Sequence, residues 1–267
     1  MNNTAALVTG GAHGIGRALC RALHAAGARV AVADLDFASA RGVAAEIDGL
    51  ALKVDVANEQ EIIDVVNRTE AEFGPVSLFV SNAGVACGDG PNGAASAPDE
   101  HWRTCLDVNL MAHVYAARVM IPRMKTRGGG CLVNVASAAG LLCQIGEAAY
   151  TASKHAAVAF AESLAITHGD DGIQVCLVCP QAVATRMTGF DDDGQAEGET
   201  GFGGNDVDGI VSSDYVADCI LDGIREQRFL VLPHPEVTTY FQRKAADHDR
   251  WVAGMQRFRR RMFGEDA

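Results

Sequence analysis

The chain has 267 residues, and its 34 Asp and Glu exceed its 22 Lys and Arg, so the formal net charge is −12. This length allows one large domain or two small ones, and the acidic balance argues against binding to a phosphate backbone, which requires a basic surface. Because the 29 glycines are accompanied by only seven prolines, glycine is expected to serve local turns rather than a disordered chain.

Short apolar segments alternate with longer helical patterns along the chain. The predicted strands are Ala5–Thr9, Arg29–Ala33, Ala51–Val54, Ser77–Ser81, Gly130–Ala136, Gln174–Cys179 and Phe229–Leu232. The predicted helices are Ile15–Ala26, Phe37–Ile47, Glu59–Phe73, Asp99–Arg127, Ala148–His168 and Asp214–Gln227. Strands that are apolar on both faces are typical of a parallel sheet covered by helices on both sides. We therefore predict an α/β fold with one doubly wound parallel sheet.

The first predicted strand and helix are joined by Thr9-Gly10-Gly11-Ala12-His13-Gly14-Ile15-Gly16. A dinucleotide pyrophosphate requires a tight turn, close approach of the backbone and free N–H groups at a helix N-terminus. Gly10, Gly14 and Gly16 meet these requirements, because only glycine admits both the torsions and the proximity. With a strand before it and a helix after it, this turn predicts a dinucleotide site.

Asp34 follows the second predicted strand, where a carboxylate hydrogen-bonds the adenosine ribose hydroxyls and repels a 2′-phosphate. The next residue, Leu35, is not a cation, so we expect NAD rather than NADP. Asp36 is the better candidate for the cap of the following helix. His13 and Arg17 are cations near the expected phosphates, and they leave NADP open as the less favoured cofactor.

Tyr150 and Lys154 are four residues apart in a predicted helix and therefore share one helix face. An ammonium next to a phenol favours the phenolate and lowers its pKa from ~10 toward working pH. Such a phenol can act as general acid or base for an alcohol. Ser137 follows a predicted strand, at the carboxyl edge where such sheets bind ligands. Together these residues predict a proton-transfer site.

The eight cysteines are scattered through apolar segments, which is typical of reduced, buried thiols in a cytoplasmic protein. Cys176 and Cys179 form a Cys-x-x-Cys pair, but residues three apart on a strand point to opposite faces, so we expect core thiols and no metal site. The N-terminus has no basic segment followed by an apolar one, and no apolar run approaches ~20 residues. We therefore expect neither a signal peptide nor a membrane span.

Residues 188–209 hold seven acids, seven glycines and no Lys or Arg. This composition does not support a packed core and predicts a flexible loop. The chain after Pro235 predicts one or two helices that end in the basic run Arg257-Phe258-Arg259-Arg260-Arg261. Such a run is more typical of a solvated face or a subunit contact than of nucleic-acid binding.

The motifs and their order resemble the short-chain dehydrogenase/reductase family, in its Tyr-x-x-x-Lys type with a Thr-Gly-x-x-x-Gly-x-Gly cofactor motif. The resemblance covers residues 5 to about 235. In addition to the features above, it rests on Asp55-Val56, Asn82-Ala83-Gly84, Asn109 and the segment Pro180 through Thr185. In that last segment, Gln181 stands where the family has glycine.

The resemblance implies a single Rossmann-type domain over residues 1–235, with about seven strands, and a short helical extension over 236–267 packed on it. It implies an NAD(H)-dependent oxidoreductase that interconverts a secondary alcohol and a ketone by hydride transfer, with Tyr150 as general acid/base. Ser137 would hydrogen-bond the substrate oxygen, Lys154 would bind the nicotinamide ribose, and Asn109 would hold a proton-relaying water. The implied cofactor-binding residues are Gly10, His13, Gly14, Ile15, Gly16, Asp34, Leu35, Asp55, Val56, Asn82, Ala83, Gly84, Tyr150, Lys154, Pro180, Val183 and Thr185.

By the same resemblance, the substrate lies between the loop after Ser137, the Gln181 region and loop 188–209, which we expect to close as a lid. The loop after Ser137 is mostly apolar, which suggests a medium-sized apolar secondary alcohol or ketone. Hydroxysteroid-like, aryl alcohol and acyl-chain substrates all stay open. The expected substrate contacts are Ser137, Cys143, Gln144, Tyr150 and Gln181.

The helix that carries Tyr150 also resembles, together with Asp99–Arg127, the dimer-forming surface of the family, and so implies a homotetramer or homodimer. The small residues that suggest this surface are Ala149, Ala152, Ala156, Ala157 and Ala161.

Two other functions stay open. The first is a nucleotide-sugar epimerase or dehydratase, which usually carries Gly-x-x-Gly-x-x-Gly and a larger C-terminal domain, whereas position 17 here is Arg. The second is a catalytically silent NAD-binding protein, which the complete set of Asn109, Ser137, Tyr150 and Lys154 disfavours.

Overall fold

The computed structural model describes residues 1, 3–89, 93–197 and 208–263. Within this part of the chain, seven parallel strands form one sheet in the order β3-β2-β1-β4-β5-β6-β7. The strands are β1 Ala5–Thr9, β2 Arg29–Asp34, β3 Leu50–Lys53, β4 Val76–Ser81, β5 Gly130–Val135, β6 Ile173–Val178 and β7 Leu230–Val231. The α-helices are α1 Gly14–Ala25, α2 Phe37–Glu46, α3 Glu59–Phe73, α4 Asp99–Leu106, α5 Ala112–Thr126, α6 Ala148–His168, α7 Ser213–Arg225, α8 Glu236–Ala246 and α9 His248–Met262. The predicted doubly wound α/β fold is confirmed.

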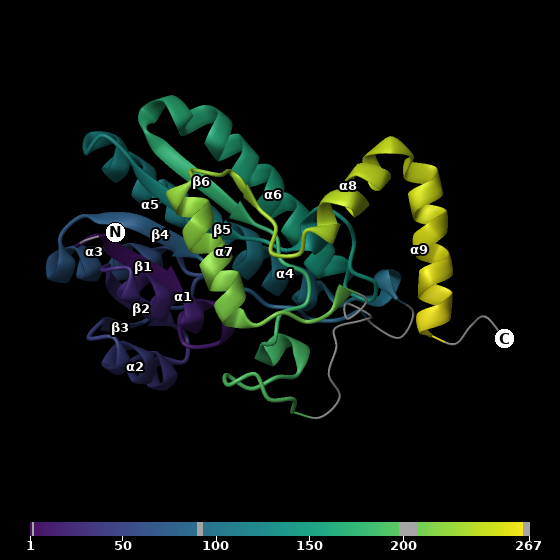
Figure 1. The fold of residues 1–267 in the computed structure, drawn as a ribbon, viewed down its shortest axis with the longest axis horizontal. Coiled ribbons are helices and arrows are strands. Elements are labelled where there is room, and N and C mark those ends of the chain that lie inside the picture. The colour runs from purple at the N-terminus through teal and green to yellow at the C-terminus, as the bar shows by residue number, and fades with distance from the viewer. Residues whose placement is uncertain (2, 90–92, 198–207, 264–267) are drawn as a thin grey trace.

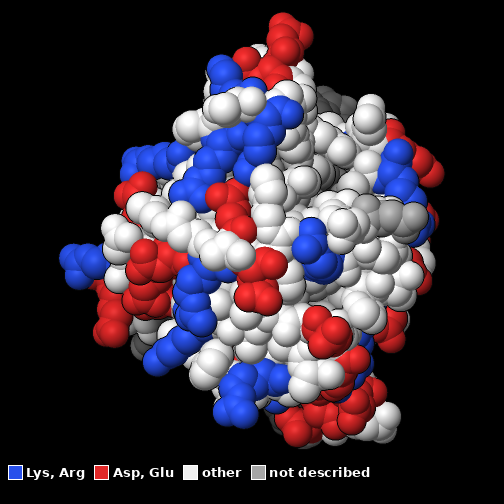
Figure 2. Space-filling view, turned by 90° about the vertical axis from the view of Figure 1, so that its left-hand side faces the viewer, with Lys and Arg blue, Asp and Glu red and all other residues white. Residues whose placement is uncertain are grey.

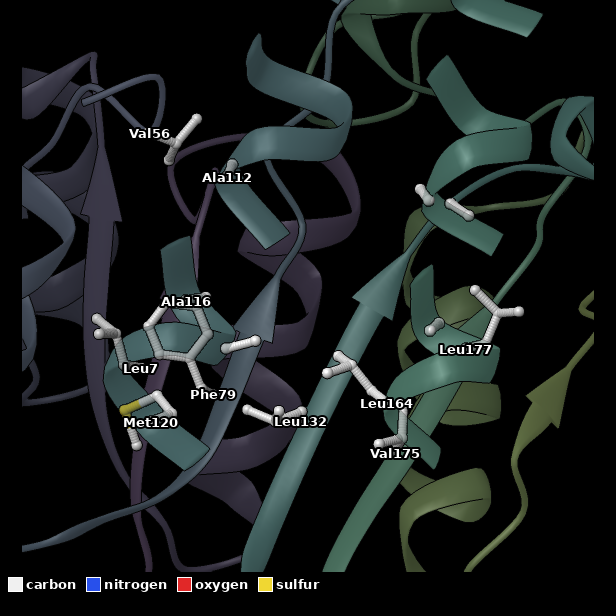
Figure 3. Packing of buried hydrophobic residues seen from close by; sticks show 14 of the residues in the cluster. Leu7, Val56, Phe79, Ala112, Ala116, Met120, Leu132, Leu164, Val175 and Leu177 are labelled. Atoms are coloured by element: carbon white, nitrogen blue, oxygen red, sulfur yellow. The ribbon is translucent and has the colours of Figure 1, made fainter. Parts of the chain in front are cut away.

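Helices cover both faces of the sheet (Figure 1), and the sheet separates two apolar cores, one on each face. Alternate residues of β1 point to opposite sides, so Leu7 belongs to the core under α3, α5 and α6, whereas Ala6 and Val8 belong to the core under α1, α2 and α7. In the first core, the ring of Phe79 lies among the side chains of Leu7 and Met120 (Figure 3). Burial on both faces explains why the strands are apolar throughout.

The predicted helix Asp99–Arg127 is wrong in one respect, because it is not a regular α-helix throughout. The chain forms α4, then a π-helical segment over Asp107–Met111, then α5. A π turn inserts one extra residue and so rotates the side chains within it relative to a continuous α-helix. Asn109 lies in this segment and is fully buried.

Cys176 and Cys179 lie on opposite sides of the sheet, as predicted. Cys176 is part of the core under α1, α2 and α7, and Cys179 is part of the core under α3, α5 and α6. Burial raises the pKa of each thiol to about 12. Both are therefore neutral apolar core residues.

The five alanines of α6 that suggest a dimer surface differ in exposure, and the dimer or tetramer stays a prediction. Ala149, Ala157 and Ala161 are buried in the protein's own cores. Ala152 is exposed and Ala156 is half-buried. The small residues of α6 therefore serve mainly close packing within the chain.

Of the two C-terminal helices, α8 packs against the core, whereas α9, apart from the core contact of its Trp251, stands away from the sheet in Figure 1. Val237 of α8 is fully buried, and the Lys244 ammonium donates to the carbonyl oxygens of Leu141 and Leu142 at 2.8 and 2.9 Å. No residue of α9 is buried, and its basic run is largely exposed. Lys244 thus fastens α8 to the loop that follows β5.

Acidic and basic side chains are interspersed on the face shown in Figure 2. Ion pairs join α3 to α5, with Arg118 at 3.1 Å from Glu59 and Arg123 at 2.6 Å from Glu70.

Within the described residues, no helix combines the length and the apolar character needed to cross a membrane.

Candidate active site

A cavity of about 430 Å³ opens at the carboxyl edge of the sheet. Residues that follow β1, β2, β4, β5 and β6 line it, as expected for the ligand edge of a doubly wound sheet. Of the residues singled out from the sequence, the structure brings together here Gly10, His13, Gly14, Ile15, Asp34, Leu35, Asp55, Val56, Asn82, Ala83, Gly84, Ser137, Cys143, Gln144, Tyr150, Lys154, Pro180, Gln181, Val183 and Thr185. Gly16 and Asn109 lie behind the cavity wall.

The glycine turn forms a cradle that side chains would fill. Gly10 and Gly14 have φ of +63° and +48°, in the left-handed region that glycine adopts without strain. A Cβ on Gly14 would lie 2.8 Å from Cγ2 of Thr185, and a Cβ on Gly16 would overlap the carbonyl oxygen of Gly10. The turn opens α1, so its first N–H groups have no partners within the helix. These features fit the pyrophosphate of a dinucleotide.

Two polar side chains fix the shape of this turn. The Asn82 amide donates to the carbonyl oxygens of Thr9 and Gly10 at 3.1 and 3.0 Å. One carboxylate oxygen of Asp34 accepts the backbone N–H of Ala12, and the other accepts that of Asp36, both at 3.0 Å. Asp36 caps α2, as predicted, by accepting the N–H of Ser39 at 3.1 Å. Asp34 therefore shapes the turn as well as the cavity.

Tyr150, Lys154 and Ser137 meet on one wall of the cavity. The Lys154 Nζ lies 5.7 Å from the centroid of the Tyr150 ring and donates to the carbonyl oxygen of Val135 at 3.1 Å. Ser137 follows β5, and its hydroxyl accepts the N–H of Ala139 at 3.0 Å. All three side chains are buried, so their hydroxyl and ammonium groups are shielded from bulk water.

The expected lowering of the Tyr150 pKa by Lys154 is not observed. Burial raises the pKa of Tyr150 to about 12, and a hydrogen bond with Ser137 opposes this rise only in part. Burial also lowers the pKa of Lys154 to about 8. Desolvation disfavours both charged forms.

The expected role of Asn109, which is to hold a water in the site, requires a side chain that faces the cavity. Asn109 does not line the cavity. Its Oδ1 accepts the N–H of Val85 at 2.9 Å, and its Nδ2 donates to the Val85 carbonyl and to Ser153 Oγ at 2.9 and 3.0 Å. The Ser153 hydroxyl in turn donates to the carbonyl of Tyr150 at 2.8 Å. Ser153, which no local motif marks, therefore connects Asn109 to the helix of Tyr150.

The segment Pro180 to Thr185 also lines the cavity, and the Pro180 carbonyl lies 3.4 Å from the Ser137 hydroxyl. The backbone N–H of Gln181 donates to Nδ1 of His234 at 3.2 Å. Gln181 has no positive φ, so a side chain is tolerated at a place where the family has glycine. Thr188 donates to the Val183 carbonyl at 2.6 Å and holds the end of this segment. His234, a buried residue after β7, was missed because no local motif marks it.

The end of the cavity near Ser137 is largely apolar. Ala138, Ala139, Leu142 and Val108 line it, together with the exposed Cys143 and the buried Gln144. The Gln144 backbone N–H donates to Thr151 Oγ1 at 3.0 Å, which ties this loop to α6.

Loop 188–209 is only partly described, because residues 198–207 lie outside the described residues. Its described first part has local structure, and the predicted flexibility of the loop stays a prediction. Gly189 to Glu197 form a small hairpin with an antiparallel bridge between Phe190 and Ala196. Asp192 contacts the glycine turn, with its carboxylate 2.8 Å from Nδ1 of His13. Ion pairs and backbone hydrogen bonds thus replace the apolar core that its composition lacks.

Comparison with known proteins gives consistent results over most of the chain. Residues 4–196 match the family described as short chain dehydrogenase. The 3beta-hydroxysteroid dehydrogenase 2 of Eggerthella lenta is 34% identical over 209 residues, which cover 74% of this chain and 80% of that protein. The 1-deoxy-11-beta-hydroxypentalenate dehydrogenase of Streptomyces exfoliatus is 34% identical over 220 residues, which cover 79% of each.

A solved structure agrees in fold over nearly the whole chain. It is a short chain dehydrogenase/reductase from Burkholderia phymatum in complex with NAD, with a TM-score of 0.81 and 25% identity. The alignment covers 93% of this chain and 95% of that one.

Proposed function

The chain belongs to the short-chain dehydrogenase family, and from that premise we propose that it is an NAD(H)-dependent oxidoreductase interconverting a secondary alcohol and a ketone. The observation that carries this proposal is the position of Tyr150, Lys154 and Ser137 on the wall of a cavity whose other end is a glycine cradle. A cradle of this kind suits a dinucleotide, and a buried phenol beside an ammonium suits proton transfer to an alcohol oxygen.

The residues of the cavity fit a nicotinamide dinucleotide. The glycine turn would hold the pyrophosphate, Asp34 the adenosine ribose, and Lys154 the nicotinamide ribose. When bound, the nicotinamide accepts or supplies the hydride. The carboxylate of Asp34 favours NAD over NADP, because a 2′-phosphate would meet its negative charge. The next position holds Leu35, which offers no positive charge to a 2′-phosphate. His13 does not supply a free cation there, since it contacts both Asp36 and Asp192.

In ketone reduction, Tyr150 donates its phenolic proton to the substrate oxygen. Ser137 donates a hydrogen bond to the same oxygen and stabilises the charge that develops on it. The Lys154 ammonium stabilises the phenolate that remains on Tyr150. In alcohol oxidation Tyr150 accepts the proton instead. Asn109 contributes by fixing Val85, a residue of the cavity wall, rather than by contact with the substrate.

We propose a mostly apolar, medium-sized substrate. The apolar lining near Ser137 supports this size and character, and two relatives act, by their names, on a hydroxysteroid and a hydroxypentalenate. Cys143, Gln144 and Gln181 supply the few polar contacts at this end of the cavity.

The proposal is tested by following NADH absorbance over a panel of secondary alcohols and ketones, with NAD and NADP compared. We expect turnover of at least one apolar substrate, with NAD preferred. An epimerase or dehydratase would convert substrate without net NADH formation. A silent binding protein would bind NAD, as measured by calorimetry, and turn over no member of the panel.

A further inference from the structure

The hairpin of residues 189–197, here called the strap, is built by its own backbone and side chains. The Glu197 N–H donates to the Gly189 carbonyl at 2.7 Å, and the Asp191 N–H donates to the Gln195 carbonyl at 2.9 Å. The Asp191 carboxylate accepts the N–H of Gln195 at 2.7 Å. These bonds fix the shape of the strap, but they do not fix where the strap lies on the protein.

Asp192 fixes that position through three donors from two other segments. Its carboxylate lies 2.8 Å from Nδ1 of His13, accepts the N–H of Gly14 at 3.2 Å and pairs with the Arg186 guanidinium at 2.8 Å. Arg17 also donates to the Asp192 backbone carbonyl at 3.2 Å. The carboxylate therefore sits at the N-terminus of α1, where an anion is favoured by the helix dipole and by free N–H groups.

The environment of Asp192 is that of a held anion rather than a solvated one. Its side chain is only 17% exposed. Burial alone would raise the pKa of this carboxyl, but the bonds from His13 and Gly14 and the charge of Arg186 lower it below its usual value. Charge-assisted hydrogen bonds of this kind are stronger than neutral ones.

Asp192 does not fill the cofactor cavity. Ile15 of the glycine turn lines the cavity, as do Arg186, Met187 and Thr188 on the segment that leads into the strap, whereas Asp192 is not part of the lining. Asp192 thus accepts one N–H of the turn without lining the cavity, and His13 and Gly14, which it contacts, line the cavity themselves. This arrangement suits a residue that closes the wall around a cofactor, and not one that replaces it.

We propose that Asp192 is a positioning residue that latches the strap onto the cofactor turn and so keeps Arg186 to Thr188 on the cavity wall. The part of this inference that concerns NAD rests on the proposed function. The latch joins the glycine turn to the segment from Arg186 to Thr188. NAD binding and closure of the strap therefore favour each other, and each raises the equilibrium constant of the other by the same factor.

The test compares Asp192→Asn with Asp193→Asn as a matched control. Asp193 is adjacent in sequence, but it is 82% exposed and has only a distant pair with Arg17 at 3.6 Å. We expect the NAD dissociation constant, measured by calorimetry, to rise at least fivefold in Asp192→Asn and to stay within twofold of wild type in Asp193→Asn. The KM for NAD should rise in parallel while kcat at saturating NAD changes less than twofold. Asp192→Glu should restore part of the affinity.

A second measurement needs no cofactor. Chymotrypsin cleavage after Phe190, mapped by mass spectrometry, should be faster in Asp192→Asn than in wild type, and unchanged in Asp193→Asn. Equal cleavage rates would overturn the latch whether or not wild type binds NAD. Failure of wild type to bind NAD would instead contradict the proposed function. Unchanged or tighter NAD binding by Asp192→Asn would also overturn it, since Asp192 would then be neutral toward the cofactor phosphates or in competition with them.

Discussion

The Lys154 ammonium lies 5.7 Å from the centroid of the Tyr150 ring, one turn away on α6. Both side chains are buried, and burial shifts their pKa values in opposite directions, up for Tyr150 and down for Lys154. Each group is therefore driven toward its neutral form. The phenolate and the ammonium stabilise each other only when both are charged, and this mutual dependence shapes the first two predictions.

Replacement of Tyr150 by Phe should abolish turnover without loss of cofactor binding. The variant removes the hydroxyl that exchanges the proton but leaves the glycine turn intact, and general acid–base catalysis contributes roughly 10²–10⁴-fold. We expect kcat to fall by about that factor, with the NAD dissociation constant within about threefold of wild type. Tyr215→Phe, at an exposed position on α7, is the control and should retain activity. Retention of substantial turnover by Tyr150→Phe would contradict the mechanism.

Ketone reduction should slow as the pH rises through about 8. Burial lowers the pKa of Lys154 to about 8, so its ammonium is present below that pH and is lost above it. Burial raises the pKa of Tyr150 to about 12, so the phenol keeps its proton across this range. Loss of the ammonium removes the charge that stabilises the phenolate formed when the proton leaves. A profile of kcat/KM against pH from 6 to 10 should show this decline, and a constant value to pH 10 would argue against it.

Ser153→Ala should lower both stability and activity, although Ser153 does not line the cavity. The variant leaves a buried N–H of Asn109 without its acceptor, which costs about 1–3 kcal/mol. Urea denaturation should show this loss of unfolding free energy. The kcat should fall severalfold, because Asn109 holds Val85 on the cavity wall. Ser77→Ala, at an exposed serine, should change neither quantity; unchanged stability of Ser153→Ala would refute the connection.

The fold and most of the cavity could be predicted from local sequence signals. Apolar strands bounded by polar residues mark the sheet, and motifs at the strand ends place Gly10, Asp34, Asn82 and Ser137 along one edge. This works because parallel strands bring their carboxyl ends together whatever lies between them. The roles of these residues stay a proposal.

The contacts that the sequence did not predict are non-local. The π turn around Asn109 differs from an α-helix by one residue, which the apolar pattern does not register. Asp192 contacts His13, 179 positions earlier in the chain, and the composition of its loop indicates only the absence of a core. The side-chain partner of Ser153 is Asn109 on another helix, and no local motif marks this contact.

Leu35→Arg should raise activity with NADP. Leu35 is 64% exposed and lines the cavity next to Asp34, so an arginine there can pair with a 2′-phosphate at little cost to the fold. We expect kcat/KM for NADP to rise at least tenfold. Asp34→Asn removes the charge and one of the two hydrogen bonds, because its single amide oxygen can accept the N–H of Ala12 but not also that of Asp36. If neither variant changes the ratio of NAD to NADP activity, the assigned adenosine site is wrong.

Gln181→Gly should change substrate preference without disturbing the cavity wall. The backbone N–H of Gln181 bonds to His234, and this bond does not depend on the side chain, so the segment should keep its place. The variant restores the residue that the family has at this position and removes an amide from the apolar end of the cavity. Bulky apolar substrates should gain kcat/KM, and substrates with a hydrogen-bonding group near the carbonyl should lose it, since each such bond is worth about 0.5–1.5 kcal/mol, or roughly 2- to 13-fold. The measurement is kcat/KM across a panel of ketones matched in size but differing in polarity, with NAD affinity as the control for an intact wall. An unchanged ranking of the panel would show that the Gln181 side chain does not contact the substrate.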